Sequence, residues 1–361
     1  MYKGTGISKD QLSDDGEPCI LYGELYTKYK SETIREVISK TNIDNTKLAR
    51  SKANDVIIPC SGETAEDIAT ARCVLNGNIL LGGDLNIIRL HGYDGTFMSY
   101  QLNGKRKYDI AKVAQGVSVV HLYGEHLKGV KTINPCLTEQ KKIASLLTLL
   151  DERIAIQNKI IEDLKKLKCA IIEKVYSEIQ GKEYSYGQLF DVVNERNKQM
   201  EYSNILSASQ EKGMVNRDDL NLDIQFERSN INTYKIVRKG DYVIHLRSFQ
   251  GGFAFSDKLG VCSPAYTILR PNSLLEYGYL SNYFTSQRFI KSLVLVTYGI
   301  RDGRSINVDE WLRMKITIPP KEHQQYIVKV IGTFERKIED EEAYAAQLSI
   351  QKQYLLRQMF I

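Results

Sequence analysis

The sequence offers five histidines as candidate acids, bases or metal ligands: His91, His121, His126, His245 and His323. None of them belongs to an HExxH motif or to another pair with the spacing of metal ligands. His121 and His126 are five residues apart in a segment that resembles a strand. We therefore expect no metal site.

Other catalytic motifs are also missing. Gly104-Lys-Arg lacks the upstream glycine and the hydroxyl of a phosphate-binding loop, and there is no GxSxG nucleophile elbow. The Pro319-Pro320 pair lacks the flanking residues with which an amino-methyltransferase holds a flipped base. The six cysteines include no CxxC pair, so neither a zinc site nor a disulfide framework is expected. We predict a binding protein without activity or a cofactor of its own.

Composition sets the broad class. The chain has 361 residues, 42% hydrophobic and 26% charged, which is enough for two domains and a connector. Its apolar runs are far shorter than the roughly 18 to 20 residues of a membrane span, and its N-terminus resembles no secretion signal. We expect a cytoplasmic protein that does not contact membranes. The net charge of +5 permits binding to a polyanion without requiring it.

Two long helices are predicted, one after Pro135 and one after Pro320. In the first, apolar residues alternate in steps of four and three, which is typical of a left-handed coiled-coil seam. Adding 184 to each of its ten seam positions gives the seam of the second helix, so we interpret the chain as a duplication. The polar seam positions are Gln157 and Lys168 in the first helix and Glu341 and Lys352 in the second. The apolar ones include Ile143, Leu147, Leu150, Ile154, Ile161, Leu164, Ile327, Ile331, Phe334, Ile338, Leu348 and Leu355.

These helices are longer than a compact domain needs, because 35 helical residues span about 50 Å. We predict that they pair antiparallel in a pseudo-twofold arrangement, with buried polar residues such as Gln157 and Lys352 fixing the register. The alternative is that each helix packs only on its own domain.

Similar elements recur upstream of each helix. We expect each half to contain β-branched strands, an amphipathic stretch, a glycine turn and a short strand that leads into the proline. The predicted class is α+β, with two globular domains in pseudo-twofold arrangement joined by two long antiparallel coiled-coil helices. The predicted limits are 1–135 for the first domain, 136–180 for the central helix, 181–318 for the second domain and 319–361 for the C-terminal helix. The paired segments are Asn54–Pro59 with Gly240–His245, Asp84–Arg89 with Ala265–Arg270, Phe97–Leu102 with Tyr279–Ile290, and Gln115–Ser118 with Asp302–Ser305.

Two similar domains on a pseudo-twofold axis suit duplex DNA that is read as two half-sites. The candidate contact segments are polar and contain glycine, with side chains that can bind base edges or phosphates. They are Ser61–Glu63 and Asn103–Tyr108 with Lys112 in the first domain, and His245–Gly252 and Tyr298–Arg304 in the second. The candidate residues are Ser61, Lys105, Arg106, Lys107, Lys112, Arg247, Ser248, Gln250, Arg301 and Arg304.

Over nearly its whole length the chain resembles the specificity subunit of type I restriction-modification systems. The most specific feature is a proline followed by Glu and Gln at the start of a long helix, which occurs twice. The segments that carry the resemblance are Pro18–Tyr26, Asp55–Asp67, Ile133–Ile143, Cys262–Pro271 and Ile316–Gln325.

The resemblance implies two target recognition domains, each reading one part of a split DNA sequence, joined by conserved helices that act as a ruler. A spacer of 50 Å corresponds to at most about 15 base pairs. Such a subunit has no activity alone. It assembles with two adenine methyltransferase subunits, which bind S-adenosylmethionine, and with ATP-dependent restriction subunits that cleave DNA. A coiled-coil adaptor between proteins, without sequence-specific DNA binding, is the alternative.

The chain differs from the family in one respect. The second half begins with a lead-in, Tyr184–Val193, that has no counterpart before Met1, whereas family members usually start with one. We therefore expect a shortened or rearranged first domain and unaltered helices.

Overall fold

The structure is a computed structural model that describes residues 1–44, 46–116, 119–209, 212–219, 228–245, 252–298 and 305–360. The chain divides into two compact units. The first unit is Met1–Ile160 with Glu341–Ile361, and the second is Ile161–Asp340. In the part described, no helix is both long enough and apolar enough to cross a bilayer.

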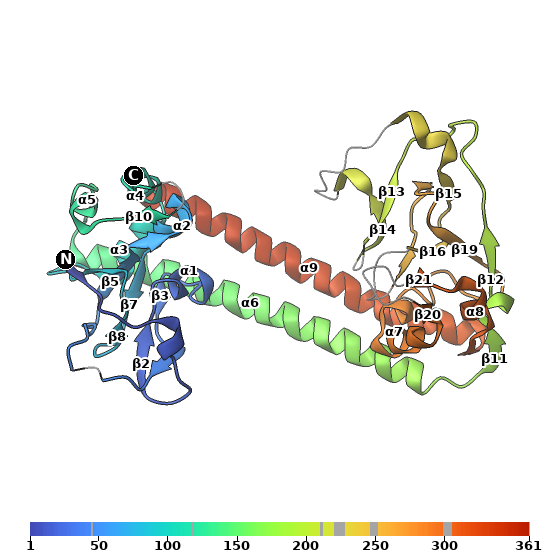
Figure 1. Ribbon diagram of the computed structural model, residues 1–361, viewed down its shortest axis with the longest axis horizontal. Helices are drawn as coiled ribbons and strands as arrows, with labels where there is room; N and C mark the ends of the chain where they lie inside the picture. The colour runs from blue at the N-terminus through green and yellow to red at the C-terminus, as the bar shows by residue number, and fades with distance from the viewer. Residues whose placement is uncertain are drawn as a thin grey trace. The chain divides into compact units, whose positions relative to one another are not determined.

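The first unit is built on a five-stranded sheet with the order β1-β9-β5-β7-β3, of which Figure 1 labels β5, β7 and β3. Successive side chains of a strand point to opposite faces. Val56 and Ile58 accordingly enter one core cluster and Ile57 the other, so β5 is buried on both sides. The strands are β1 (Tyr2–Lys3), β2 (Glu17–Ile20), β3 (Thr33–Ile34), β4 (Ser39–Thr41), β5 (Asp55–Pro59), β6 (Ser61–Gly62), β7 (Arg72–Val74), β8 (Leu80–Leu81), β9 (Leu85–Ile88) and β10 (Val120–His121). The short helices are α1 (Glu24–Thr27), α2 (Ala65–Ile68), α3 (Gly95–Asn103), α4 (Lys107–Lys112) and α5 (Gly124–Lys128).

The second unit centres on the sheet β12-β19-β16-β17. Here too the central strand alternates, because Tyr242 and Ile244 enter an aromatic core around Trp311 while Val243 enters another cluster. The strands are β11 (Lys182–Ser185), β12 (Phe190–Val193), β13 (Leu206–Ser209), β14 (Gly213–Asn216), β15 (Lys235–Val237), β16 (Tyr242–Ile244), β17 (Phe253–Phe255), β18 (Gly260–Cys262), β19 (Thr267–Pro271), β20 (Thr297–Tyr298), β21 (Ser305–Ile306) and β22 (Lys315–Ile318). The short helices are α7 (Gln287–Ser292) and α8 (Val308–Arg313).

Two long helices, α6 (Leu137–Ser177) and α9 (Lys321–Met359), contribute to both units. In the first unit they run antiparallel. Lys352 forms an ion pair with Asp151 at 2.6 Å, and the Gln157 amide donates to the Glu341 carboxylate. The predicted α+β class with two antiparallel long helices is confirmed.

Each unit repeats a turn that holds a buried aspartate. Asn54, with φ 77°, precedes Asp55, and Gly240, with φ 94°, precedes Asp241. The Asp55 carboxylate accepts two hydrogen bonds from Arg89, at 3.0 and 2.8 Å, and one from the Lys52 backbone. Asp241 is bound in the same way by Arg270, at 2.9 and 3.0 Å, and by the Arg238 backbone. The strand duplication predicted from the sequence therefore extends to this pair of interactions.

A glutamine that follows the proline, Gln140 or Gln324, attaches each long helix to its own unit. The Gln140 amide donates to the Pro135 carbonyl at 2.7 Å and accepts from the Asp94 backbone. Gln324, 184 residues later, donates to the Pro319 carbonyl at 2.9 Å and accepts from the Glu276 backbone. Each glutamine thus links the carbonyl of a proline just before its helix to a backbone N–H elsewhere in the same unit.

The prediction of a short strand before each long helix is correct only in the second unit. There, β22 pairs with β11 and leads into Pro319. In the first unit residues 130–134 form no strand. The Gln101 side chain instead donates to the carbonyl and accepts from the backbone N–H of Ile133. A side-chain amide therefore satisfies backbone groups that a neighbouring strand would otherwise pair.

Candidate DNA interface

The structure brings two of the predicted contact segments of the first unit together. β6, which contains Ser61, pairs with β10, so that Ser61 lies opposite His121. The helix that follows β6, α2, packs against both α4 and β10. Ser61–Glu63 and the helix that ends at Lys112 therefore belong to one continuous surface region.

The basic residues of this region differ in accessibility. Lys105 and Lys112 are exposed and Lys107 is half-buried. The side chain of Arg106 is only 17% exposed, and its guanidinium pairs with Asp109 at 3.4 Å. Phosphate binding requires an accessible cation, so Lys105 and Lys112 are the best placed of the four. Ser61 is buried, with little of its side chain available to a ligand.

Lys105 lies beside the end of α9. It lines a shallow groove with Gly104 on one side and Gln353, Leu356 and Arg357 of α9 on the other. The arginine at this edge adds a second cation to the groove. Positive charge in the first unit thus continues from the α3–α4 turn onto the long helix.

Acidic residues on β6 and α2 border the basic residues of α4. Glu63, Glu66 and Asp67 lie on β6–α2, and the Thr64 hydroxyl donates to the Asp67 carboxylate at 2.7 Å. Burial raises the pKa of Tyr26, with smaller contributions that include Asp67 and Glu63. The α2 side therefore has a negative character, and the α4 side is the one suited to a phosphate backbone.

The predicted contact residues of the second unit, Arg247, Ser248, Gln250, Arg301 and Arg304, lie outside the described residues. The strands beside them are described. Ile244 of β16 pairs with Phe253 of β17, and the His245 backbone N–H donates to the Gly252 carbonyl at 2.8 Å. Burial lowers the pKa of His245. β20 pairs with β21 on either side of the other candidate segment. The described strands on either side of both segments therefore belong to this unit.

Three exposed residues at the contact segments of the first unit are absent from the candidate residues named above: Tyr108, at the end of the segment Asn103–Tyr108, and His121 and Tyr123. Tyr108 is 66% exposed and its ring lies 4.3 Å from the Lys112 ammonium. His121 and Tyr123 are also exposed, and their rings are partly stacked. The sequence did contain a pattern that indicates their exposure. His121 and Tyr123 alternate with the apolar Val120 and Leu122, which is typical of an extended segment with one solvent-exposed face.

The seam residues of the long helices all face away from solvent to some degree. Buried members are Leu147, Ile161, Ile327, Ile331, Ile338 and Leu348, and half-buried members are Ile143, Leu150, Ile154, Leu164, Phe334 and Leu355. Ile143, Leu147 and Leu355 join the cluster that contains Phe97 of α3 and Phe360. In the second unit Ile327 and Ile331 enter the aromatic core. The seams thus also attach each domain to the helices.

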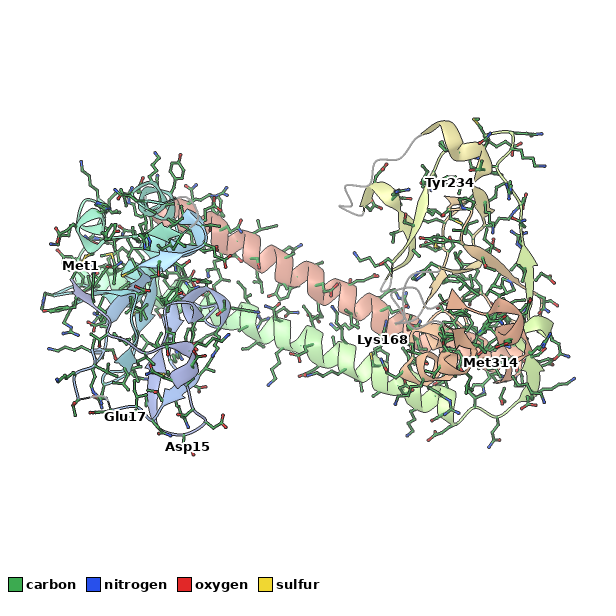
Figure 2. The ribbon with its side chains drawn as sticks, viewed as in Figure 1. Met1, Asp15, Glu17, Lys168, Tyr234 and Met314 are labelled. Atoms are coloured by element: carbon green, nitrogen blue, oxygen red, sulfur yellow. The ribbon has the colours of Figure 1, made fainter. Side chains whose placement is uncertain are left out.

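The polar seam residues pair with residues related by the repeat. In the second unit Lys168 forms an ion pair with Glu335 at 3.1 Å (Figure 2). Adding 184 to Asp151 gives Glu335, and adding 184 to Lys168 gives Lys352. The pair Asp151–Lys352 therefore becomes Glu335–Lys168 when the two helices are exchanged. The pair of Gln157 with Glu341, which also differ by 184, maps onto itself.

Among the described residues, no group of three or more His, Cys, Asp and Glu side chains is arranged to hold a metal ion. The candidate residues described above offer hydrogen-bond donors, ammonium groups and aromatic rings to a ligand. Those groups suit recognition of a nucleic acid.

Comparisons with known proteins agree with this chemistry. Residues 181–349 match the family described as the type I restriction modification DNA specificity domain. The fold is similar to the S subunit of a type I restriction-modification system from M. genitalium, with a TM-score of 0.58 and 15% identity over 100% of this chain and 93% of that chain.

A second similar structure comes from work described as the structural basis underlying complex assembly and conformational transition of the type I R-M system. It has a TM-score of 0.60 and 14% identity over 99% of this chain and 93% of that chain. The family match over residues 181–349 agrees with the resemblance and supports the DNA-recognition function predicted from the sequence.

Proposed function

We propose that the chain recognises a bipartite double-stranded DNA target, one part through each domain, and recruits the methyltransferase and restriction subunits of a type I complex. It binds two adenine methyltransferase subunits. These subunits bind S-adenosylmethionine, the restriction subunits use ATP, and the chain itself has no catalytic activity. The same function places it in the cytoplasm with its DNA substrate.

The observation that carries this proposal is the exchange of polar pairs between the long helices. Asp151–Lys352 and Lys168–Glu335 are the same interaction in two copies. A repeated interaction of this kind supports a pseudo-twofold relation between the two helices. Dimeric DNA-binding proteins use the same symmetry to place one domain on each of two half-sites. The accessible lysines of the first unit, Lys105 and Lys112, supply the phosphate contacts that give such binding its strength.

Methylation mapping tests the proposal most directly. Cells that contain this chain and its methyltransferase subunit should modify two short fixed sequences separated by a fixed number of undefined base pairs. Binding by the purified complex should weaken with salt, log K falling linearly with log salt. A continuous target, or association that is blind to sequence, would contradict the proposal.

The role of the helices as a ruler has its own test. One heptad inserted into both helices, within residues 159–168 of α6 and the facing stretch of α9, adds about 10 Å. The permitted spacer should lengthen by up to about three base pairs, while both half-sites stay the same. The same insertion in α6 alone is the control, because it disrupts the seam register. An unchanged spacer in the double insertion would refute the ruler.

The predicted DNA contacts of the second domain are tested by Arg247→Ala and Arg304→Ala, one in each of its two candidate segments. Each change should relax specificity at single base pairs of the second half-site and leave the first unaffected. An equal loss on all sequences would assign the residue to phosphate binding instead. Methylation or cleavage by the purified chain alone would contradict the absence of catalytic activity.

A further inference from the structure

The backbone of His121 is held from two sides although its side chain is exposed. Gln115 and His121 exchange both backbone hydrogen bonds, with N···O distances of 2.9 and 2.7 Å. On the other side β10 pairs with β6, which places His121 opposite Ser61. Because the backbone is already fixed, it loses little conformational freedom when the side chain binds a ligand.

Tyr123 extends the same exposed edge. The rings of His121 and Tyr123 are 6.3 Å apart with an interplanar angle of 29°. Tyr123 is 46% exposed, whereas Leu122 between the two rings is fully buried in the core. The alternation fixes which side chains face solvent. An imidazole and a phenol on one face can both donate and accept hydrogen bonds, as contacts to base edges require.

Lys112 supplies a positioned cation near this edge. Its ammonium lies 4.3 Å from the centroid of the Tyr108 ring, which is within the range of a cation–π interaction. Among the ion pairs of the described residues, Lys112 has no carboxylate partner. The charge is thus held in place by a neutral ring and stays available to an anion.

The acidic groups closest to these residues in the sequence pair with other cations. Asp109 pairs with Arg106 at 3.4 Å, and Glu125 pairs with Lys128 at 2.7 Å. The remaining carboxylates nearby, those of α2, lie on the helix that packs against α4. Repulsion between like charges directs a phosphate backbone away from α2 and toward Lys112.

We propose that His121 and Tyr123 contact base edges of the first half-site, while Lys112, held over Tyr108, binds an adjacent phosphate. We call these four residues the hairpin face. The inference rests on the proposed DNA-recognition function and adds His121 and Tyr123 to a region in which Lys112 was already a candidate phosphate contact.

The test uses the complex of the full chain with its methyltransferase subunit, and DNA duplexes that differ from the mapped target by one base pair. His121→Phe keeps a ring beside Tyr123 but removes both nitrogens. It should lower discrimination at one base pair of the first half-site about 10- to 100-fold, with the second half-site unchanged. Tyr123→Phe removes only the hydroxyl and should relax the same or the neighbouring base pair.

The phosphate contact gives a different signature. Lys112→Met should weaken binding to all sequences about equally and reduce the salt slope by about one. Tyr108→Leu should reproduce part of the Lys112→Met loss, because it removes the ring that holds the ammonium. The matched controls are His91→Phe and Tyr93→Phe, which change exposed residues of the same unit outside the hairpin face. Both controls should leave recognition unaltered.

The outcomes separate this inference from the proposed function. If the wild-type complex reads a bipartite target but His121→Phe retains full discrimination in the first half-site, the hairpin face is refuted and the function stands. The inference also fails if His121→Phe weakens binding to every sequence equally. If the wild-type complex shows no bipartite preference, both fail. Thermal unfolding of each variant verifies that it is folded.

Discussion

The two units use one pair of helices but attach their domains to it by different interactions. In the first unit the Lys352 ammonium lies between the carboxylates of Glu32, at 2.9 Å, and Asp151, at 2.6 Å. In the second unit Tyr176 of α6 packs against aromatic rings, with Tyr283 at 5.0 Å between centroids. The duplication therefore constrains the seam of the helices and the contacts of Gln140 and Gln324, whereas these other contacts between helix and domain have diverged.

The two kinds of attachment have different energetics. Burial raises the pKa of Glu32, an effect that Lys352 opposes and Asp151 reinforces. Burial by itself lowers the pKa of Lys352, but Glu32 and Asp151 together outweigh it and raise that pKa. Attraction within such a cluster mainly offsets the cost of removing charges from water. Aromatic burial adds stability directly. We infer that the first attachment fixes position and the second contributes more stability.

The largest effect is expected from Tyr176→Ala. It removes a buried ring that contacts Tyr279 and Tyr283, so the free energy of unfolding of the second unit should fall by about 3 to 5 kcal/mol. Trp311 is the only tryptophan and lies in this unit, so its fluorescence during urea denaturation reports the change. Tyr176→Phe removes only the hydrogen bond to the Tyr279 carbonyl and should cost about 1 kcal/mol. Equal losses for the two variants would show that the ring packing is unimportant.

Matched lysine substitutions test the polar attachment. Lys352→Met leaves two carboxylates facing each other without a cation and should cost about 3 kcal/mol. Lys168→Met removes the related pair, whose Glu335 partner is 40% exposed, and should cost less than about 1 kcal/mol. For Lys352→Met, circular dichroism should show that the first unit unfolds at a lower urea concentration, while the unfolding transition reported by Trp311 fluorescence stays unchanged. Similar losses for both lysines would remove the contrast between the units.

The sequence predicted the parts of the molecule that depend on local periodicity. The seam of the long helices and the central strands follow from spacing alone, and Lys352 was expected to be a buried polar seam residue. Its partner Glu32 could not be predicted, because the two are 320 residues apart and the contact depends on how the first domain folds. The Asp55–Arg89 and Asp241–Arg270 pairs were also missed, because loops of different length separate the partners in the two units.

Prediction of the candidate interface was limited for a related reason. Lysine content identified Lys105 and Lys112, but their accessibility, and the low accessibility of Arg106, depend on the α3–α4 turn and on Asp109. The exposure of His121 depends on the pairing of β10 with a strand almost 60 residues earlier. Residue type therefore indicates which chemistry is available, and tertiary packing determines which side chains can use it.

The aspartate turns are the feature that the two units share, so their loss should affect both alike. Asp55→Asn and Asp241→Asn each weaken a paired interaction with an arginine and a bond to a backbone N–H. Each should lower the free energy of unfolding of its own unit by about 1.5 to 3 kcal/mol. Denaturation monitored by circular dichroism and by Trp311 fluorescence separates the two units. A loss in only one unit would show that the repeated geometry no longer has a repeated role.

The smallest effect is a pH dependence that tests the cost assigned to the charged cluster. Because the pKa of Glu32 is raised above 4.5 in the folded protein, the folded state binds a proton more readily than the unfolded state does. Acidification from pH 7 should therefore stabilise the wild type relative to Glu32→Gln, which cannot titrate, until the pH falls below the ordinary value of 4.5. Urea denaturation at a series of pH values measures this difference.

Lys352 contributes nothing to that slope, because its pKa is raised from 10.5 and the group stays charged throughout the range. The slope thus reports the balance between the burial of Glu32 and its interaction with Asp151, which raise its pKa, and its attraction to Lys352, which lowers it. If the wild type instead loses stability relative to Glu32→Gln on acidification, the ionised carboxylate is the favoured form. The charged cluster would then stabilise the first unit outright, and the contrast with the aromatic attachment of the second unit would be one of chemistry alone.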